Sequence, residues 1–283
     1  MIDGVPQSNP LRDSARDSYT IDLSMVERIE VIYGASAEHG LGATGGIINY
    51  ITRRADTGTI NQEASVSLTS DDDFDSDGQG HKVDYSISGQ KGDWDYLGAI
   101  SQQKRGVFYD GDDQLVGIAY PGELQNSTSY DVMGRVGYWI DDNQNIELML
   151  NHFELEGEGD YVPVPGDRDE GIPTRARPGD PVGDPGFNKV TTASFSYSHA
   201  DWFGNKADVQ VYGQQFRAQF ATTPFFPYVD SAGNSQLDQT RNESDKVGAK
   251  FTLTRNGLLN NRLGITTGLD LLQDETNQDL VHT

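Results

Sequence analysis

The chain has 283 residues, with 44 acidic side chains against 21 Lys and Arg, and its formal net charge is −23. This balance argues against a nucleic-acid-binding protein, because phosphates require a basic protein surface. No run of 18 apolar residues occurs, so a transmembrane helix is excluded, whereas membrane β-strands, which are apolar on one face only, are not. The absence of Cys fits an oxidising envelope compartment, and no secretory signal peptide is visible.

The first distinctive stretch, VERIEVIYGASAEHGLGATGGIINYITRR, runs from Val26 to Arg54 after a short lead-in. Its first eight residues predict a strand. A bend of small residues follows, and glycine at that density lets the backbone turn sharply or approach other backbone closely. The β-branched run from Ile47 to Thr52 predicts a second strand, which we expect to pair with residues 29–33 or with the lead-in.

This stretch resembles the end of the plug domain of TonB-dependent outer-membrane receptors. The family pattern is roughly V-E-R-I-E-V-L-R-G-P, a small-residue bend, and then G-G-V-I-N-I-I-T-K. The chain has VERIEVIYGA at 26–35 and GGIINYITR at 45–53, and IDGVP at 2–6 is similar to the family's D-G-V-P strand and turn. The signature residues are Asp3, Gly4, Val26, Glu27, Arg28, Glu30, Gly34, Gly45, Gly46, Asn49 and Thr52.

The resemblance implies that residues 1–55 form the C-terminal part of a plug domain and residues 56–283 the N-terminal part of a transmembrane β-barrel. The sequence departs from the pattern at Tyr33, Ala35 and His39, where the family usually has Arg, Pro and Tyr. In the family, that Arg helps to hold the plug inside the barrel, so the resemblance leaves the locking contact open here.

Glycines 40, 42 and 45 also spell G-x-G-x-x-G, the dinucleotide fingerprint. That motif requires a helix immediately afterwards and an acidic residue about 20 positions further on. A strand-like run follows instead, without a βαβ pattern, so a dinucleotide site is not expected.

From Thr59 onwards, apolar and polar residues alternate with a period of two in nine segments, which predicts nine antiparallel strands in sequential order over residues 59–274. The segments are 64–69, 82–88, 94–108, 132–138, 146–151, 192–198, 207–214, 246–254 and 263–271.

The connections alternate between short turns and long polar segments, as in a membrane barrel with short periplasmic turns and long outer loops. Trp94, Trp139 and Trp202 lie beside short turns and predict an aromatic girdle, although aromatic residues are also common in strands generally. The short turns are expected at 91–93, 141–145, 203–205 and 257–260, and the long loops at 70–80, 109–128, 157–188 and 221–241.

The predicted fold is therefore mainly β: a partial antiparallel meander transmembrane barrel of about nine strands, with the end of a plug. Single-chain bacterial barrels have even strand counts, and the family has a plugged barrel of about 22 strands, on the order of 500 residues, so we expect a fragment. The apolar sets, such as Val83/Tyr85/Ile87, should face lipid, and the polar sets, such as Lys82/Asp84/Ser86, should face the lumen.

The acidic loop after the first strand contains D-x-D-x-D-G, the start of a calcium loop, with Asp84 at its twelfth position. The alternative is a solvated loop tip, because the twelfth ligand is normally Glu and no helices flank the segment. The five histidines show no metal-ligand spacing, and no nucleophile–base pair stands out, so an enzyme is not expected. The weak calcium candidates are Asp73, Asp75, Asp77 and Asp84.

The loop from Glu156 to Phe187 is the best candidate for ligand contact, because loops of this length are usually functional or disordered. Its arginines could bind an anionic iron chelate, or could balance neighbouring acids such as Asp167 and Glu170. Aromatic residues in the loop that starts at Ala221 could form a platform or pack on their neighbours. The candidates are Tyr161, Arg168, Arg175, Arg177, Phe225, Phe226 and Tyr228.

The resemblance implies TonB-dependent uptake of a ferric siderophore across the bacterial outer membrane, with TonB, the siderophore and lipid as partners. Iron enters only as part of the transported chelate, and no resident cofactor is expected. The alternatives are a receptor for another scarce nutrient such as cobalamin or an oligosaccharide, a passive porin, and a secreted calcium-binding β-protein.

Overall fold

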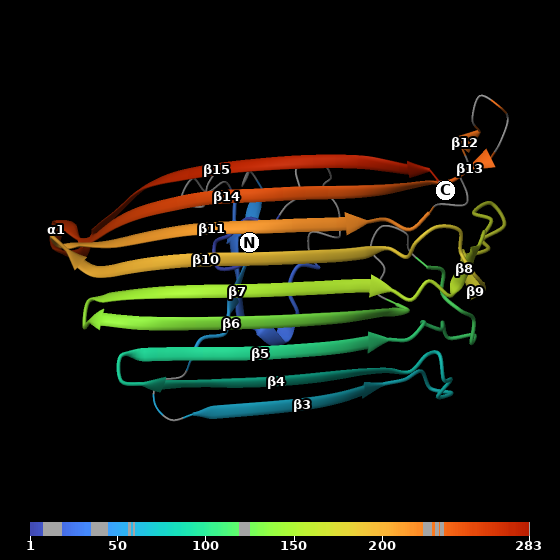
Figure 1. Ribbon diagram of the computed structural model, residues 1–283, viewed down its shortest axis with the longest axis horizontal. Coiled ribbons are helices and arrows are strands. Elements are labelled where there is room, and N and C mark those ends of the chain that lie inside the picture. Colours follow the sequence, from blue (N-terminus) through green and yellow to red (C-terminus); the bar gives the residue numbers. More distant parts are fainter. Residues whose placement is uncertain are drawn as a thin grey trace.

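The computed structural model describes residues 1–7, 19–34, 45–55, 58, 60–118, 125–222, 228–229, 232 and 235–282. Within these residues, nine strands form one antiparallel sheet in which the strands lie side by side in sequence order (Figure 1). The predicted meander is thereby confirmed. The nine strands are β3 (Asn61–Thr69), β4 (Gly80–Lys91), β5 (Trp94–Arg105), β6 (Ser127–Asp141), β7 (Gln144–Gly157), β10 (Phe187–Trp202), β11 (Asn205–Gln219), β14 (Asp238–Gly257) and β15 (Leu263–His282).

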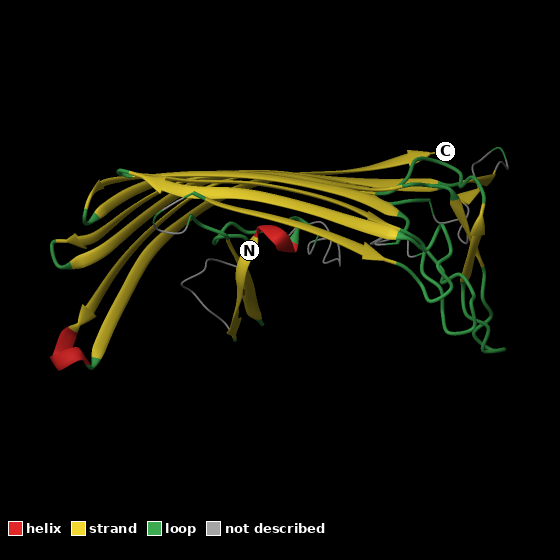
Figure 2. Ribbon diagram, turned by 90° about the horizontal axis from the view of Figure 1, so that it is seen from below, coloured by secondary structure: helices red, strands yellow, loops and turns green. Residues whose placement is uncertain are grey.

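The sheet is strongly curved, with a convex and a concave face (Figure 2). Its strands alternate between the two faces, because successive side chains of a strand point to opposite sides. In β6, Val132 is 52% exposed, whereas its neighbours Asp131 and Met133 are each 1% exposed. The exposed set of Val83 and Val247 belongs to the same outer face, which is the convex one, and the predicted assignment of apolar residues to this face is confirmed.

Short and long connections lie at opposite ends of the sheet, as predicted (Figure 1). Residues 92–93, 142–143 and 203–204 make the two-residue turns, and α1 (Leu258–Asn261) makes the fourth short connection. The long connections contain two small hairpins of their own, β8 (Tyr161–Val164) with β9 (Arg175–Pro178) and β12 (Tyr228–Val229) with β13 (Ser235–Gln236).

Two details differ from the sequence prediction. The connection predicted as a plain turn at 257–260 is a four-residue helix, α1, in which Leu259 and Asn260 have left-handed backbone angles. Strand β5 ends at Arg105 rather than near Phe108. Beyond β5, the Val107 N–H donates to the Asp77 carbonyl in the loop after β3 at 2.8 Å. Gly106 lies so close to the same loop that an added Cβ would be 2.3 Å from that carbonyl oxygen.

The tryptophans lie at the short-turn end, but they do not all face the same way. Trp94 packs against Tyr138 on the convex face, with ring centroids 4.7 Å apart. Trp139 follows Tyr138 directly, so strand alternation places it on the other face, where its Nε1 donates to Asp95 at 3.1 Å. The predicted girdle is wrong for Trp139 for this reason.

The described N-terminal residues lie against the concave face (Figure 2). A short 3-10 helix, η2 (Leu23–Met25), leads into β1 (Val26–Tyr33), which pairs antiparallel with β2 (Gly46–Thr52). The predicted pairing is confirmed, and β2, rather than a helix, follows Gly45. Gly40, Gly42 and His39 lie outside the described residues.

Among the described residues, one small hydrophobic cluster joins the N-terminal residues to the sheet. It joins Ile2, Ile21 and Met25 to inward-facing side chains of β5 and β6. Among the described residues, no helix has the length and hydropathy needed to cross a membrane. The boundary expected after residue 55 falls between β2 and β3 and stays a prediction.

Candidate functional site

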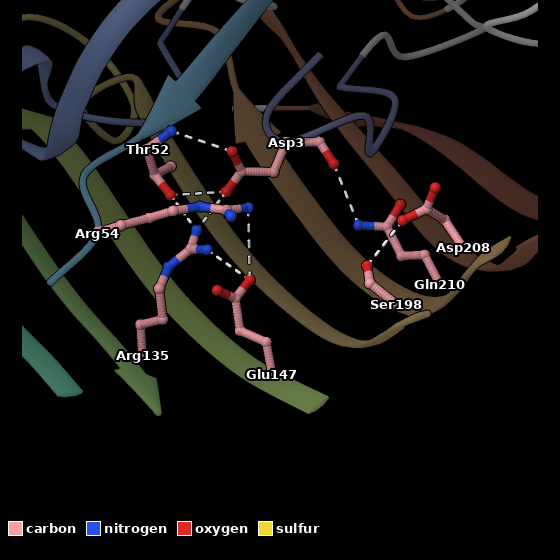
Figure 3. A network of polar contacts seen from close by, with 8 residues as sticks. All are labelled: Asp3, Thr52, Arg54, Arg135, Glu147, Ser198, Asp208 and Gln210. Carbon is pink, nitrogen blue, oxygen red and sulfur yellow. Dashed lines mark hydrogen bonds and ion pairs between the residues drawn. The ribbon is translucent and has the colours of Figure 1, made fainter. Parts of the chain in front are cut away.

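The central contact between the N-terminal residues and the sheet is a buried arginine on β6 (Figure 3). The Arg135 side chain is 1% exposed and pairs with Asp3 at 2.5 Å on one side and with Glu147 at 2.5 Å on the other. It also donates to the Thr52 hydroxyl, while the Asp3 carboxylate accepts from the Thr52 backbone N–H at 3.0 Å. Arg54 adds a longer ion pair to Glu147 at 3.7 Å. We call these five residues the latch.

The latch joins both ends of the N-terminal segment, by which we mean residues 1–55, to the same point of the sheet, because Asp3 precedes β1 and Thr52 ends β2. The charges of Arg135, Asp3 and Glu147 are largely buried, whereas Arg54 is exposed. A buried pair that loses one partner leaves an uncompensated charge. Removing one partner of the latch is therefore expected to weaken the attachment of the N-terminal segment strongly.

A second buried contact lies near η2. Lys82 of β4 donates to the Asp22 carboxylate at 2.6 Å, and the Asp22 backbone N–H donates to Asp131 of β6 at 2.6 Å. Burial by itself raises the pKa of Asp22, but hydrogen bonds from Lys82 and Ser24 outweigh it and hold the pKa below its usual value. The Asn151 amide also donates to Asp131, which is 1% exposed.

Further strands reach the N-terminal residues through hydrogen bonds. Gln210 of β11 donates to the Asp3 carbonyl at 3.1 Å, and Lys250 of β14 donates to the Gly4 carbonyl at 2.6 Å. Asn188 of β10 donates to the Tyr19 carbonyl at 3.2 Å. The segment is thus attached to strands across most of the sheet, and mainly by polar groups.

The predicted signature residues fall into three groups. Asp3, Gly4, Asn49 and Thr52 meet at the latch, where the Gly4 N–H donates to the Asn49 side chain at 3.1 Å. Arg28 is exposed and pairs only with its neighbours Glu27 and Glu30, while Val26 begins the strand that carries them. The three glycines, Gly34, Gly45 and Gly46, stand at the ends of β1 and β2.

Of these glycines, Gly46 is the one whose backbone angle and surroundings most clearly require glycine. Its φ is +141° and an added Cβ would lie 2.7 Å from the Ile32 carbonyl oxygen, so only glycine fits. Arg135 and Glu147 lie in the predicted strands 132–138 and 146–151, on the polar side of the alternation, but the sequence did not identify them as partners of Asp3. The sequence feature that could have identified them is their opposite charge at inward positions of two adjacent strands.

At the end of the sheet that carries the long connections, hydrogen bonds and an ion pair join these connections to one another. The Asp77 carboxylate accepts from the Tyr109 hydroxyl at 2.9 Å and the Tyr161 hydroxyl at 2.6 Å. These hydrogen bonds, that of Tyr161 first, hold the pKa of Asp77 below its usual value. Arg175 pairs with Asp110, so this predicted ligand arginine balances an acid, although not one of its sequence neighbours.

The other loop candidates are placed as follows. Arg168 is exposed in a turn, and Arg177 is exposed on β9. No hydrogen bond or ion pair holds either guanidinium within the described part of the chain. Phe225 and Phe226 lie outside the described residues, and Tyr228 lies in β12.

The four predicted calcium ligands are not brought together. Asp73 and Asp75 are exposed, Asp77 binds the two tyrosines, and Asp84 lies 3.5 Å from the Lys82 ammonium on the concave face. The described residues contain no group of three or more acidic or histidine side chains arranged for a metal ion.

A pocket of about 230 Å³ lies among the long connections. Tyr161 and Arg177 line it, together with the Pro-rich segment 181–186 and residues 221–222. Two of the predicted ligand-contact residues therefore share one cavity, and Arg168 and Arg175 do not line it.

Comparison with known proteins agrees with this architecture. The family model of the TonB-dependent Receptor Plug Domain matches residues 1–47. The rhizobactin receptor of Rhizobium meliloti (strain 1021) is 33% identical over 171 residues, covering 57% of this chain and 22% of that protein. The ferric aerobactin receptor of Klebsiella pneumoniae is 28% identical over 283 residues, covering 95% of this chain and 37% of that protein. Residues 1–47 thus match the plug domain of TonB-dependent receptors, and the chain resembles a siderophore receptor over most of its length.

Solved structures share the fold of this chain. The ferripyoverdine receptor of the outer membrane of Pseudomonas aeruginosa matches with a TM-score of 0.65 at 14% identity, covering 98% of this chain and 36% of that one. The copper transporter OprC matches with a TM-score of 0.67 at 16% identity, covering 99% and 39%. The receptor chain spans between about a fifth and two fifths of the length of these relatives.

Proposed function

We propose that this receptor takes up ferric siderophores across the bacterial outer membrane with energy supplied through TonB. The geometric observation that carries the proposal is the position of the N-terminal segment, which lies on the concave face of a sheet whose convex face is apolar. A segment in that position obstructs the lumen of a barrel, so passage requires that it move. A passive porin has no need of such an obstruction.

The contacts between the N-terminal segment and the sheet are of a kind that allows the segment to move. Apart from one small apolar cluster, the segment is held by hydrogen bonds and ion pairs to β4, β6, β10, β11 and β14. Water can replace hydrogen bonds of this kind one by one as the segment withdraws, so the net free energy of each is small. The latch, with its buried charges, is the contact that resists most.

The substrate class is supported by the relatives, which are receptors for rhizobactin and ferric aerobactin. The fold alone does not select it, because a copper transporter has the same fold. Iron is cargo in this proposal, carried as part of the chelate.

The test uses the receptor gene product, by which we mean this chain with any coding sequence that flanks it. It is expressed in a host that lacks its own siderophore receptors, and uptake of ⁵⁵Fe is measured with ferric aerobactin and ferric rhizobactin. We expect uptake of at least one chelate, lost when TonB is deleted although surface binding remains. Uptake that persists without TonB would identify a passive pore, and transport of only cobalamin or copper would overturn the siderophore assignment.

A further inference from the structure

At the loop end of the sheet, two tyrosine hydroxyls meet one carboxylate. Tyr109, from the connection after β5, donates to Asp77 Oδ1 at 2.9 Å. Tyr161, from the connection after β7, donates to Asp77 Oδ2 at 2.6 Å. Asp77 itself belongs to the connection after β3 (Figure 1). Three connections that are distant in sequence therefore share one group of three oxygen-bearing side chains.

A fourth oxygen lies beside this group. The Asp71 Oδ2 atom is buried and accepts no hydrogen bond within the part of the chain that the structure describes. It lies against Gly78, the residue after Asp77, because a Cβ added to Gly78 would be 2.3 Å from Asp71 Oδ2 and 3.4 Å from the Tyr109 ring. The other Asp71 oxygen accepts from the Asp75 N–H at 2.9 Å and fixes the carboxylate in this position. A buried carboxylate oxygen without a donor requires an explanation, since the loss of its hydration is not compensated.

The charge around these oxygens is negative. Among the described residues, neither of the two carboxylates forms an ion pair with Lys or Arg, and Asp75 and Asp160 add further negative charge near the tyrosines. Burial first, and then the hydrogen bond to Asp77, raise the pKa of both tyrosines above its usual value. At neutral pH both phenols therefore keep their protons, and the group attracts a cation without being able to offer it a phenolate in advance.

The donor atoms select the kind of cation. Two carboxylates and two phenols are an all-oxygen set, which suits hard metal ions. A strongly polarising ion deprotonates its ligands as it binds, and tyrosinate is a known ligand of iron. The two hydrogen-bond lengths, 2.9 and 2.6 Å, are close to the separation of about 2.9 Å between neighbouring oxygens in an octahedral shell of radius about 2.0–2.1 Å. An ion can therefore replace the two hydrogen-bonded protons with little movement of the side chains.

We propose that Asp71, Asp77, Tyr109 and Tyr161 form a binding site for a bare ferric ion, separate from the transported chelate. Two phenol O–H bonds break, two bonds from phenolate oxygen to iron form, and the two protons pass to solvent. The iron stays ferric throughout, so the step needs no electron donor or acceptor. The bound ion joins the connections after β3, β5 and β7 by metal–ligand bonds. This differs from the sequence-based expectation, in which iron enters only within the chelate, and it does not depend on the proposed transport function.

The test uses the receptor gene product, purified in detergent micelles without any siderophore. The probe is ferric nitrilotriacetate, because this weak chelate leaves coordination positions of the iron open. Phenolate bound to Fe³⁺ gives a charge-transfer absorption band in the visible range, which carboxylates alone do not give. Binding is followed by this band, by the amount of iron retained per chain, and by the protons released into a weakly buffered solution.

Each variant has a matched control. Tyr109→Phe and Tyr161→Phe keep the rings and each remove one phenol oxygen. Their control is Tyr197→Phe, because the Tyr197 hydroxyl also donates to a side-chain oxygen, but at the short-turn end of the sheet. Asp77→Asn is compared with Asp75→Asn, at an exposed acid of the same connection that accepts from neither tyrosine.

We expect the wild-type chain to bind one ferric ion with a visible band, and to release two more protons per ion than the double variant Tyr109→Phe/Tyr161→Phe. Each single Tyr→Phe variant should shift and weaken the band, and the double variant should lack it. Asp77→Asn should weaken binding by roughly a hundredfold or more, beyond the tenfold to hundredfold typical of a residue that only supports a ligand. The controls Tyr197→Phe and Asp75→Asn should keep the band and the stoichiometry. An excess of Ca²⁺ should not displace the iron.

Several outcomes would overturn the site. A wild-type chain that retains no ferric ion, or retains it without the visible band, contradicts the proposal. A band that persists in the double variant, or that disappears in Tyr197→Phe, contradicts the assignment of the two phenols. Displacement of the iron by Ca²⁺ contradicts the assignment to a ferric ion. Heat-shifted electrophoretic mobility confirms that each variant is folded. The ⁵⁵Fe measurement tests chelate uptake separately, so failure of either proposal leaves the other standing.

Discussion

The two faces of the sheet are built from the same strands and differ at every residue. On the convex face, side chains such as Val132, Val211 and Val247 are about half exposed. On the concave face, the alternate residues are buried and largely polar, and they bind the N-terminal segment. Arg135, a buried charge, lies one residue from the exposed Val136.

On this sheet, therefore, the more hydrophobic face is not the buried one. In a water-soluble sheet the apolar face is the buried one, whereas here the apolar face is exposed and the polar face is buried. The outer membrane resolves the contradiction, because lipid surrounds the convex face and the lumen accepts polar groups. The following substitutions compare the two faces, beginning with the largest expected effect.

Arg135→Met on the concave face should cost about 3–5 kcal/mol, because it leaves the carboxylates of Asp3 and Glu147 buried without their partner. We expect the N-terminal segment to detach, seen as protease cleavage within residues 1–55 of the receptor gene product in vesicles. Arg28→Met is the matched control, since its pairs with Glu27 and Glu30 are exposed and contribute roughly 0–1 kcal/mol.

A triple variant tests the mechanism of this loss. Adding Asp3→Asn and Glu147→Gln to Arg135→Met removes the uncompensated charges and should restore part of the protection. If the triple variant is cleaved as fast as the single one, charge burial is not what makes the latch strong.

Ala249→Arg on the convex face should cost roughly 2–4 kcal/mol near the membrane midplane, where lipid solvates a charge poorly. Its neighbour Lys250 is on the concave face, where it donates to the Gly4 carbonyl and lies 3.8 Å from Asp270. Lys250→Ala should therefore fold normally in lipid. Urea titration in vesicles measures both, and normal folding of Ala249→Arg with failure of Lys250→Ala would reverse the assignment of the faces.

Much of this two-faced sheet could be predicted, because strand periodicity is local. The alternation in β14, for example, separates Val247 from Lys246 without knowledge of any neighbour. The plug strands were found through two sequence signatures. The failures are also confined to single positions: adjacent Tyr138 and Trp139 cannot both face lipid, and β5 ends early where Gly106 lies close to another loop.

The contacts between distant residues could not be predicted. Asp3 and Arg135 are 132 positions apart, and their pairing depends on how the N-terminal segment docks, which no periodicity encodes. The same holds for Arg175, whose partner Asp110 is 65 positions away although several acids are nearer in sequence. The pocket is lined by residues from three separate connections, so its residues could be proposed singly but not as a group.

A smaller expected effect is weaker docking of the N-terminal segment at low pH. The folded-state pKa of Asp22 lies below its unfolded value, so this carboxylate stabilises the docked segment at neutral pH, and the contribution disappears as pH falls through the folded pKa. We expect protease access to residues 1–55 to increase below about pH 4. The other charged groups around Asp22 are Lys82, Arg105 and Asp131, and they are the same in both arms of the test.

The variant for this test is Asp22→Asn, which should weaken docking at neutral pH and reduce the change between pH 6 and pH 3. Glu27→Gln, at an exposed carboxylate of the same segment, should leave the acid dependence as in wild type. An undiminished acid response in Asp22→Asn would assign the response to other carboxylates.

The smallest expected effect separates the two faces at the short-turn end of the sheet. Trp94 and Tyr138 pack together on the convex face, and an aromatic pair of this kind contributes about 0.5–1.5 kcal/mol beyond its buried area. Trp139 is on the other face and binds Asp95. Brominated lipids quench only tryptophans that lipid contacts, so Trp94→Phe should lower the fraction of fluorescence that is quenched. Trp139→Phe should raise that fraction, because it removes a tryptophan that lipid does not reach. Equal changes in the two variants would mean that Tyr138 and Trp139 do not alternate between lipid and lumen.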